Sequence, residues 1–216
     1  MKNEKFETLS FHSGQTFFTW IKENWPKVGV IVSLFLTIYL VVIVLPKSTL
    51  YFAILMCTPL YILHEVDEYI FPGGFAQFMN KDIYKSDPEN GPVTFNAVFW
   101  INVVAVWTAL PLFSLWSLYD ITQAIAIPYF FIFQAILHLV LGIIGKRPLN
   151  PGMFTAWFIH VPWGIWTISL FVKAGMITHP YWNEAAKVAL LIILALGFAG
   201  FILVLRYKRR LNRQHQ

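Results

Sequence analysis

The chain has 216 residues, of which 57% are hydrophobic and only 12% are charged. A soluble globular domain carries about 25% charged residues, so this chain has too little polar surface for a fold surrounded by water. Its formal charge is +5, but the basic residues gather at the ends of apolar segments. That distribution is typical of membrane proteins and excludes nucleic acid as the expected partner. The single cysteine, Cys57, excludes a disulfide within the chain and a Cys-based zinc cluster.

Six apolar stretches are each long enough to cross a bilayer as a helix, which takes about 20 residues. Turn-forming segments such as Pro46-Lys47-Ser48 and Phe71-Pro72-Gly73-Gly74 separate them. Interior prolines at positions 59, 111, 128 and 162 are tolerated as kinks in membrane helices. The sequence therefore predicts an all-α fold, a polytopic membrane helical bundle of about six transmembrane helices. The expected spans are Val28–Leu45, Leu50–Tyr69, Phe95–Leu118, Ile121–Ile144, Phe154–Val172 and Ala185–Leu205.

The basic residues predict how this bundle is oriented. With both termini in the cytoplasm, the outside holds only Lys47, Lys173 and Lys187, and all other Lys and Arg residues lie inside. This arrangement satisfies the positive-inside rule, and the inverted one violates it. We therefore expect a multi-pass protein of the cell membrane in three parts. These are a cytoplasmic or interfacial N-terminal segment (1–27), a single transmembrane domain (28–205) and a basic cytoplasmic tail (206–216).

The second span ends with the run His64-Glu65-Val66-Asp67-Glu68, an imidazole and three carboxylates within five residues. Ionisable side chains at membrane depth are costly and usually functional. His64 and Glu68 are four residues apart on the predicted helix and His64 and Asp67 are three apart, so all three side chains can face one site. This run is the strongest functional signal in the chain.

Polar residues of three other spans fall at the depth of His64. With a rise of about 1.5 Å per residue, His64, Asn102, His138 and His160 each lie roughly 10–12 Å from the cytoplasmic boundary. Asn96 is shallower, as are Asp67 and Glu68, and Gln134 lies one turn deeper than His138 on the same helix face. A shared cavity open to the cytoplasm would satisfy all these residues together. The alternative is that each helix satisfies its own polar residue with a local hydrogen bond.

The residue types in this layer suit a divalent metal such as zinc, iron or manganese. The candidate ligands are His64, Asp67, Glu68, His138 and His160. Glu68 is a candidate catalytic residue, as is Glu65, because His64-Glu65-x-x-Glu68 parallels the zincin pattern, in which the glutamate after the first histidine is the general base. Glu65 could instead pair with Lys81 or Lys85. A site without metal also remains open, in which a histidine beside carboxylates relays protons.

The segment Asn150-Pro151-Gly152 opens the fifth span and is most simply a turn. A Pro-Gly turn with Thr155 at the start of the helix could also present backbone N–H groups to an anionic group.

Several of these residues together resemble a known family. The run Leu63–Tyr69, followed by Phe71-Pro72-Gly73-Gly74-Phe75, resembles the signature of the HXXEE-domain family of small multi-pass membrane proteins. Asn96, His138 and the segment 150–155 extend the similarity, which covers about residues 50–170. The resemblance implies roles for His64, Asp67, Glu68 and His138, and it places Glu65 at a variable position. Asp67 departs from the glutamate that the family name implies, and its shorter side chain would need a closer metal or a bridging water. The family supplies no substrate.

The leading functional hypothesis is a metal-dependent enzyme, a hydrolase or an isomerase, that acts on a lipid-like or amphiphilic substrate arriving from membrane lipids. Two alternatives remain. One is a proton-coupled transporter or carrier, which predicts access from both sides of the membrane. The other is a non-catalytic lipid- or metal-binding membrane protein.

Overall fold

The computed structural model describes residues 16–214, apart from the side chains of Gln123 and Gln214. The described residues form helices that are joined by turns. The α-helices are α1 (Phe17–Tyr39), α2 (Thr49–Leu55), α3 (Cys57–Tyr69), α4 (Phe75–Phe78), α5 (Phe95–Val104), α6 (Leu110–Trp116), α7 (Ala126–Ile144), α8 (Met153–Thr155), α9 (Val161–Lys173) and α10 (Glu184–Gln214). π-Helical turns extend four of them, at Leu40–Val44, Met79–Ile83, Ala105–Ala109 and Ala156–His160, and a 3-10 turn covers Ile121–Ile125.

Side-chain caps fix the starts of several helices. Thr16, Ser48, Thr94 and Asn183 each accept a hydrogen bond from the backbone N–H three residues ahead. Such a cap satisfies one of the N–H groups that the first turn of a helix leaves without a partner. These four caps begin α1, α2, α5 and α10, so the polar residues between the apolar runs define where the runs become helical.

Six helical stretches are long and apolar enough to cross a membrane, which confirms the predicted fold class. They are Phe17–Val44, Thr49–Tyr69, Phe95–Trp116, Ala126–Ile144, Met153–Lys173 and Glu184–Arg213. The first begins at Phe17 instead of Val28, and the last continues past Leu205. The fourth begins at Ala126 instead of Ile121, because Asp120 caps the 3-10 turn that precedes it.

The start of α1 belongs to the bundle. The helix passes through Pro26 without a break, and Trp25 is only 1% exposed. The Trp25 ring packs on Tyr69 and Trp107 at centroid distances of 5.1 and 6.3 Å. The predicted N-terminal segment 1–27 is therefore continuous with the first span over residues 17–27, and its first fifteen residues lie outside the described part of the chain.

Prolines mark the points where the spans change helical form. Pro111 and Pro162 each follow a π-helical turn, and Pro59 lies in the first turn of α3, after the break at Met56. Proline lacks an N–H group and its ring displaces the carbonyl four residues earlier, so it removes a helical hydrogen bond and favours a kink or a change of helical form. The kinks predicted from these prolines thus appear as local changes of helical form, and each span continues as a helix on both sides of the change.

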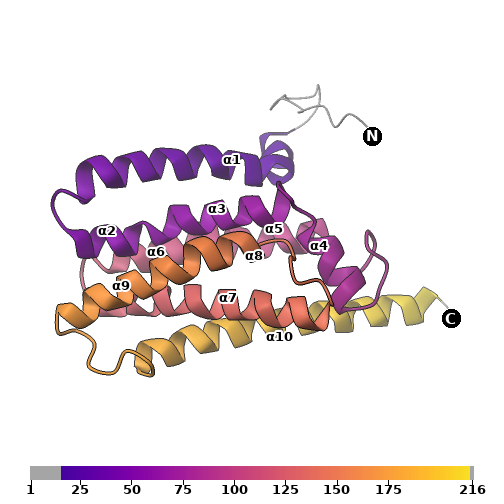
Figure 1. Cartoon of the computed structure of the whole chain (residues 1–216). Helices are drawn as coiled ribbons and strands as arrows, with labels where there is room; N and C mark the ends of the chain where they lie inside the picture. The colour runs from indigo at the N-terminus through magenta and orange to yellow at the C-terminus, as the bar shows by residue number, and fades with distance from the viewer. Residues whose placement is uncertain (1–15, 215–216) are drawn as a thin grey trace.

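The second span is the most buried of the six, and the first and last are the least buried. Figure 1 shows α1 along one side of the bundle and α10 along the opposite side, with α3, α5, α7 and α9 between them. α1 packs closely on α3, where a Cβ at Gly29 would lie 2.9 Å from Ile62 Cγ2. The ionisable residues of α3 therefore lie in the interior.

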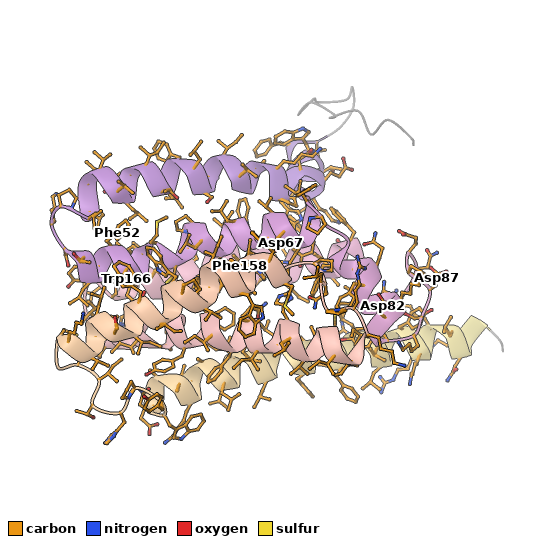
Figure 2. The ribbon with its side chains drawn as sticks, viewed as in Figure 1. Phe52, Asp67, Asp82, Asp87, Phe158 and Trp166 are labelled. Carbon is orange, nitrogen blue, oxygen red and sulfur yellow. The ribbon has the colours of Figure 1, made fainter. Side chains whose placement is uncertain are left out.

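The first residues of α1 and the last residues of α10 lie at the same end of the bundle (Figure 1), here called the terminal end. The connection between α3 and α5 also lies there, and Asn80 holds it in place. The Asn80 side chain donates to the carbonyls of Pro88 and Val93 and accepts from Val93 N at 2.8 Å. In Figure 2, Asp82 and Asp87 of this connection lie at the terminal end, and Asp67 lies on α3.

Candidate functional site

Three ligand-type atoms from two helices meet inside the bundle. His64 Nε2 lies 3.2 Å from His138 Nε2. Glu68 Oε1 lies 3.5 Å from His64 Nε2 and 3.4 Å from His138 Nε2. These three residues, called the triad below, are between 0% and 4% exposed. The structure thus brings together three of the residues that the sequence singled out as metal ligands.

Helix geometry places the triad. His64 and Glu68 are one turn apart on α3, so both side chains point toward the same neighbour. That neighbour is α7, which carries His138 at the same depth. The aromatic rings of His64 and His138 meet edge to face, with centroids 4.9 Å apart. The depth argument from sequence therefore holds for this pair.

The outer nitrogen of His64 is held by Thr155, at the start of the fifth span. Thr155 Oγ1 lies 2.8 Å from His64 Nδ1 and 2.9 Å from Asp67 Oδ2. The backbone N–H of Thr155 also donates to Asp67 Oδ2, at 2.8 Å. The Pro-Gly turn thus does present an N–H group to an anionic group, and that group is Asp67.

The outer nitrogen of His138 is held in the same way by Asn150. Asn150 Oδ1 lies 2.9 Å from His138 Nδ1, and Asn150 Nδ2 donates to the His138 backbone carbonyl at 2.9 Å. Asn150 is 3% exposed. The asparagine therefore fixes both the side chain and the backbone of the histidine that it contacts.

These contacts determine where the histidine protons lie. Asn150 Oδ1 can only accept, so His138 carries its proton on Nδ1. The Thr155 hydroxyl gives its one proton to Asp67, so it accepts from His64 Nδ1–H. Both Nε2 atoms are then acceptors that face each other and the Glu68 carboxylate. An additional proton or a metal ion between them could satisfy these three acceptors.

The distances within the triad suit a metal ion. Zinc binds histidine nitrogen and carboxylate oxygen at about 2.0–2.2 Å with tetrahedral geometry, which separates neighbouring ligand atoms by about 3.4 Å. The separations in the triad are 3.2, 3.4 and 3.5 Å. The group His64, Glu68 and His138 could therefore hold a metal ion.

Gly152 gives the triad the space that it occupies. Its φ angle is +89°, and a Cβ atom there would overlap the His138 ring and lie 2.9 Å from Glu68 Cγ. A side chain at this position would therefore be strained by its backbone and would also displace two members of the triad.

His160 lies beside the triad, but its nitrogens are not part of it. Its ring stacks between Phe131 and Tyr61, with centroid distances of 4.0 and 5.2 Å, and lies 4.6 Å from the His64 ring. Neither of its nitrogens makes a hydrogen bond of ordinary geometry with a described residue, although the Leu60 backbone does interact with the ring. The ligand role of His160 stays a prediction, as does that of Asp67, whose carboxylate contacts Thr155.

Glu65 faces away from the triad. It is fully buried, and its Oε2 accepts a hydrogen bond from Trp107 Nε1 at 3.0 Å. Its Oε1 has no hydrogen-bond partner among the described residues. Glu65 therefore contacts neither Lys81 nor Lys85 through a described hydrogen bond, and its catalytic role stays a prediction that the triad geometry does not support.

The other predicted polar residues divide into two groups. Asn102 donates to Tyr69 Oη at 3.2 Å, and together with Gln134 and Glu68 it lines a cavity of about 230 Å³. Asn96 is exposed and lines a separate cavity at the terminal end of α10. The polar layer therefore includes Asn102 and Gln134 but not Asn96.

Sequence reasoning missed two residues that hold the triad, Asn150 as a partner of His138 and Thr155 as a partner of His64. The available signal was the turn Asn150-Pro151-Gly152, which places both residues beside the first turn of a span. A turn motif cannot show which buried histidine it contacts, because that depends on how the helices pack.

The fold and the site define a multi-pass helical protein with a buried His–Glu–His group. A family model described as "Protein of unknown function with HXXEE motif" matches residues 55–167, just over half of the chain. The protein belongs to this family, which confirms the resemblance. The triad and its partners lie inside the matched range, and α1 and α10 lie outside it. No curated protein and no solved structure matches the chain.

Proposed function

We propose that the protein is a metal-dependent membrane enzyme that acts on a lipid-like substrate, with the triad as ligands of one divalent ion. The observation that carries this proposal is the set of three buried acceptor atoms separated by 3.2–3.5 Å. These separations suit zinc, and iron and manganese accept the same ligand types.

The ligand number favours catalysis over a structural role. Structural zinc sites have four protein ligands, whereas catalytic sites have three and keep one position open. A bound ion would supply Lewis-acid chemistry or an activated water. His64 and His138 would bind through Nε2, and Asp67 would increase the basicity of His64 through Thr155. Glu68 would bind the ion and accept a proton from the reacting group, in a hydrolysis or an isomerisation.

The proposal includes the orientation of the protein. The distribution of basic residues supports a cytoplasmic location for both termini. The terminal end of the bundle then faces the cytoplasm, and the triad lies in the cytoplasmic half of the membrane. A substrate would approach from the surrounding lipid, because the bundle exposes apolar side chains along its length.

Metal analysis of the purified protein tests the proposal. We expect about one bound transition-metal ion per chain, lost in His64→Ala, His138→Ala and Glu68→Gln variants. His179→Ala is the matched control, because His179 lies outside the spans and should leave the metal content unchanged. Thermal unfolding in detergent verifies that each variant is folded.

The proposal fails if the folded protein carries no transition metal and takes up none when zinc is supplied. It also fails if the metal content is the same in all three triad variants as in the control. Substrate turnover by the metal-loaded protein then distinguishes an enzyme from a non-catalytic binding protein.

A proton-coupled carrier is the second candidate function, and the geometry of the same triad favours it. A separation of 3.2 Å between the two Nε2 atoms also suits a hydrogen bond, so one additional proton could occupy the triad. This candidate predicts proton flux into proteoliposomes that depends on His64 and needs no metal. Flux that persists in His64→Ala, or that is absent from the native protein, excludes it.

A further inference from the structure

Two connected cavities lie along α10, between this helix, α5 and α7. The first, called the apolar cavity, has a volume of about 280 Å³ and is partly open. Its lining includes Val106, Ala109, Leu110, Phe113, Ile127 and Phe130. The second, called the mixed cavity, is the 230 Å³ cavity beside Glu68. Tyr61, Ile101, Asn102 and Leu196 line both cavities, which therefore meet at the depth of these residues.

Helix packing and small side chains create this space. α10 packs mainly on α7, and its contacts with α5 are few. On α10, Gly197 lines the mixed cavity, and a Cβ at that position would meet no atom within 4 Å. On α5 and the turn that follows it, Ala105 and Ala109 line the apolar cavity. The two cavities together, called the groove below, thus result from the helix packing and from these small side chains.

Polar groups gather where the two cavities meet and in the mixed cavity next to that point. Glu68, Asn102 and Gln134 line the mixed cavity there, and the apolar cavity beyond them is lined almost entirely by hydrocarbon. Gln134 is 7% exposed, and its Oε1 has no hydrogen-bond partner among the described residues. A buried amide carbonyl without a donor is unfavourable, so this atom is suited to a ligand that brings an O–H or N–H group.

Charge limits the kind of ligand. Neither cavity is lined by a described Lys or Arg residue, and Glu68 contributes a carboxylate. A phosphate or carboxylate head group would therefore be poorly accommodated beside the acceptors. Tyr84, on the terminal side of the mixed cavity, contributes a neutral hydroxyl at neutral pH, and burial raises its pKa further.

We propose that this groove binds a long-chain amphiphile with an uncharged polar group that carries an O–H or N–H, such as a fatty alcohol or a fatty amide. Its hydrocarbon tail occupies the apolar cavity, and its polar group contacts Gln134 beside Glu68. From Gln134 to Ala126 the α7 helix rises about 12 Å, which gives the length available to the tail inside the bundle. The assignment of this ligand as the substrate rests on the proposed function, because Glu68 also belongs to the triad.

Photolabelling of the full-length protein tests the groove. The probe is a C16 fatty alcohol with a diazirine in its chain and a terminal alkyne, added to the purified protein in detergent. We expect labelled peptides from α5, α7 and α10, and loss of this labelling in Gly197→Leu and Ala109→Phe, whose side chains fill the mixed and the apolar cavity. Ala195→Leu and Val104→Phe are the matched controls, because both residues are exposed and line neither cavity.

A second variant tests the polar end of the groove. Gln134→Leu should weaken labelling by the alcohol probe without weakening labelling by the alkane of the same length. Labelling that is equal in all variants, or that is spread over the outer surface of the bundle, overturns the proposal. So does labelling by the alcohol probe that is as strong in Gln134→Leu as in the native protein.

Metal content measured on the same samples separates the two proposals. The cavity-filling variants should keep their metal, because they leave the triad intact. Specific labelling of a protein that carries no metal supports the groove and overturns the enzyme. A metal that depends on the triad, without specific labelling, overturns the groove and leaves the enzyme proposal standing.

Discussion

Thr155 connects His64 to Asp67 through a single hydroxyl group. Its Oγ1 accepts from His64 Nδ1 at 2.8 Å and donates to Asp67 Oδ2 at 2.9 Å. Asp67 occupies the first acidic position of the family motif, which the sequence suggested as a metal ligand. In the structure this carboxylate contacts a triad histidine through an intermediate residue, and its own role as a ligand stays a prediction.

Removal of the Thr155 hydroxyl should weaken metal binding without abolishing it. In Thr155→Val, His64 loses its outer hydrogen-bond partner, and the loss of such a partner typically lowers metal affinity about 10–100-fold. Competition with a chromophoric chelator measures this affinity. Thr155→Ser keeps the hydroxyl and should stay close to the native value. An unchanged affinity in Thr155→Val would show that the hydroxyl does not orient His64.

Two glycines with positive φ provide a matched pair. Gly152 (φ +89°) lies against His138 and Glu68, whereas a Cβ at Gly175 (φ +73°) would meet no atom within 4 Å. Gly175→Ala should cost about 1 kcal/mol from backbone strain. Gly152→Ala should add about 1–3 kcal/mol from overpacking and should also lower the metal content. Thermal unfolding and metal analysis measure both effects, and equal results for the two variants would show that the overlap at Gly152 is relieved without disturbing the triad.

The sequence predicts the depth of the functional residues better than their direction. A rise of about 1.5 Å per residue places His64, His138 and His160 in one layer, and their rings do lie together, with centroid distances of 4.9 and 4.6 Å from His64. Rotation about each helix axis is a different quantity, because it depends on packing. The π-helical turn at Ala156–His160 changes the rotation of the fifth span, and Pro162 predicts an irregularity there but not its type or the direction that His160 takes.

The division of the acidic run among three environments also needed the structure. The spacing of His64 and Glu68 predicted a common face, and the two meet. Asp67 shares that side of α3 but reaches Thr155 on the fifth span, and Glu65 reaches Trp107 beside α1. Helix periodicity gives these directions relative to one another, whereas the identity of the neighbouring helix in each direction is a tertiary property.

Replacement of His160 by phenylalanine should leave the metal in place. The His160 ring stacks on Phe131 and Tyr61, and neither nitrogen has a hydrogen-bond partner of ordinary geometry among the described residues. His160→Phe keeps the stacking and removes two buried polar atoms, so stability should stay the same or rise by about 1–3 kcal/mol. Metal analysis and thermal unfolding measure the two quantities. Loss of metal would instead identify His160 as a fourth ligand, as the sequence suggested.

Glu65 should contribute to stability through Trp107 and not to metal binding. Trp107 Nε1 donates to Glu65 Oε2 at 3.0 Å, and Trp163 Nε1 donates at the same distance to the Ala53 carbonyl. Trp107→Phe leaves a buried carboxyl group without its donor, whereas Trp163→Phe removes a donor from a backbone carbonyl.

The cost of the first substitution should therefore exceed that of the second, because a buried group left without its partner costs about 1–3 kcal/mol and more when it is charged. Thermal unfolding of the two variants in detergent gives the comparison, with Trp107→Phe expected to unfold at the lower temperature. Both should retain their metal, because neither indole contacts the triad. Loss of metal in Trp107→Phe, with metal kept in Trp163→Phe, would mean that Glu65 acts on the triad and would restore its catalytic candidacy.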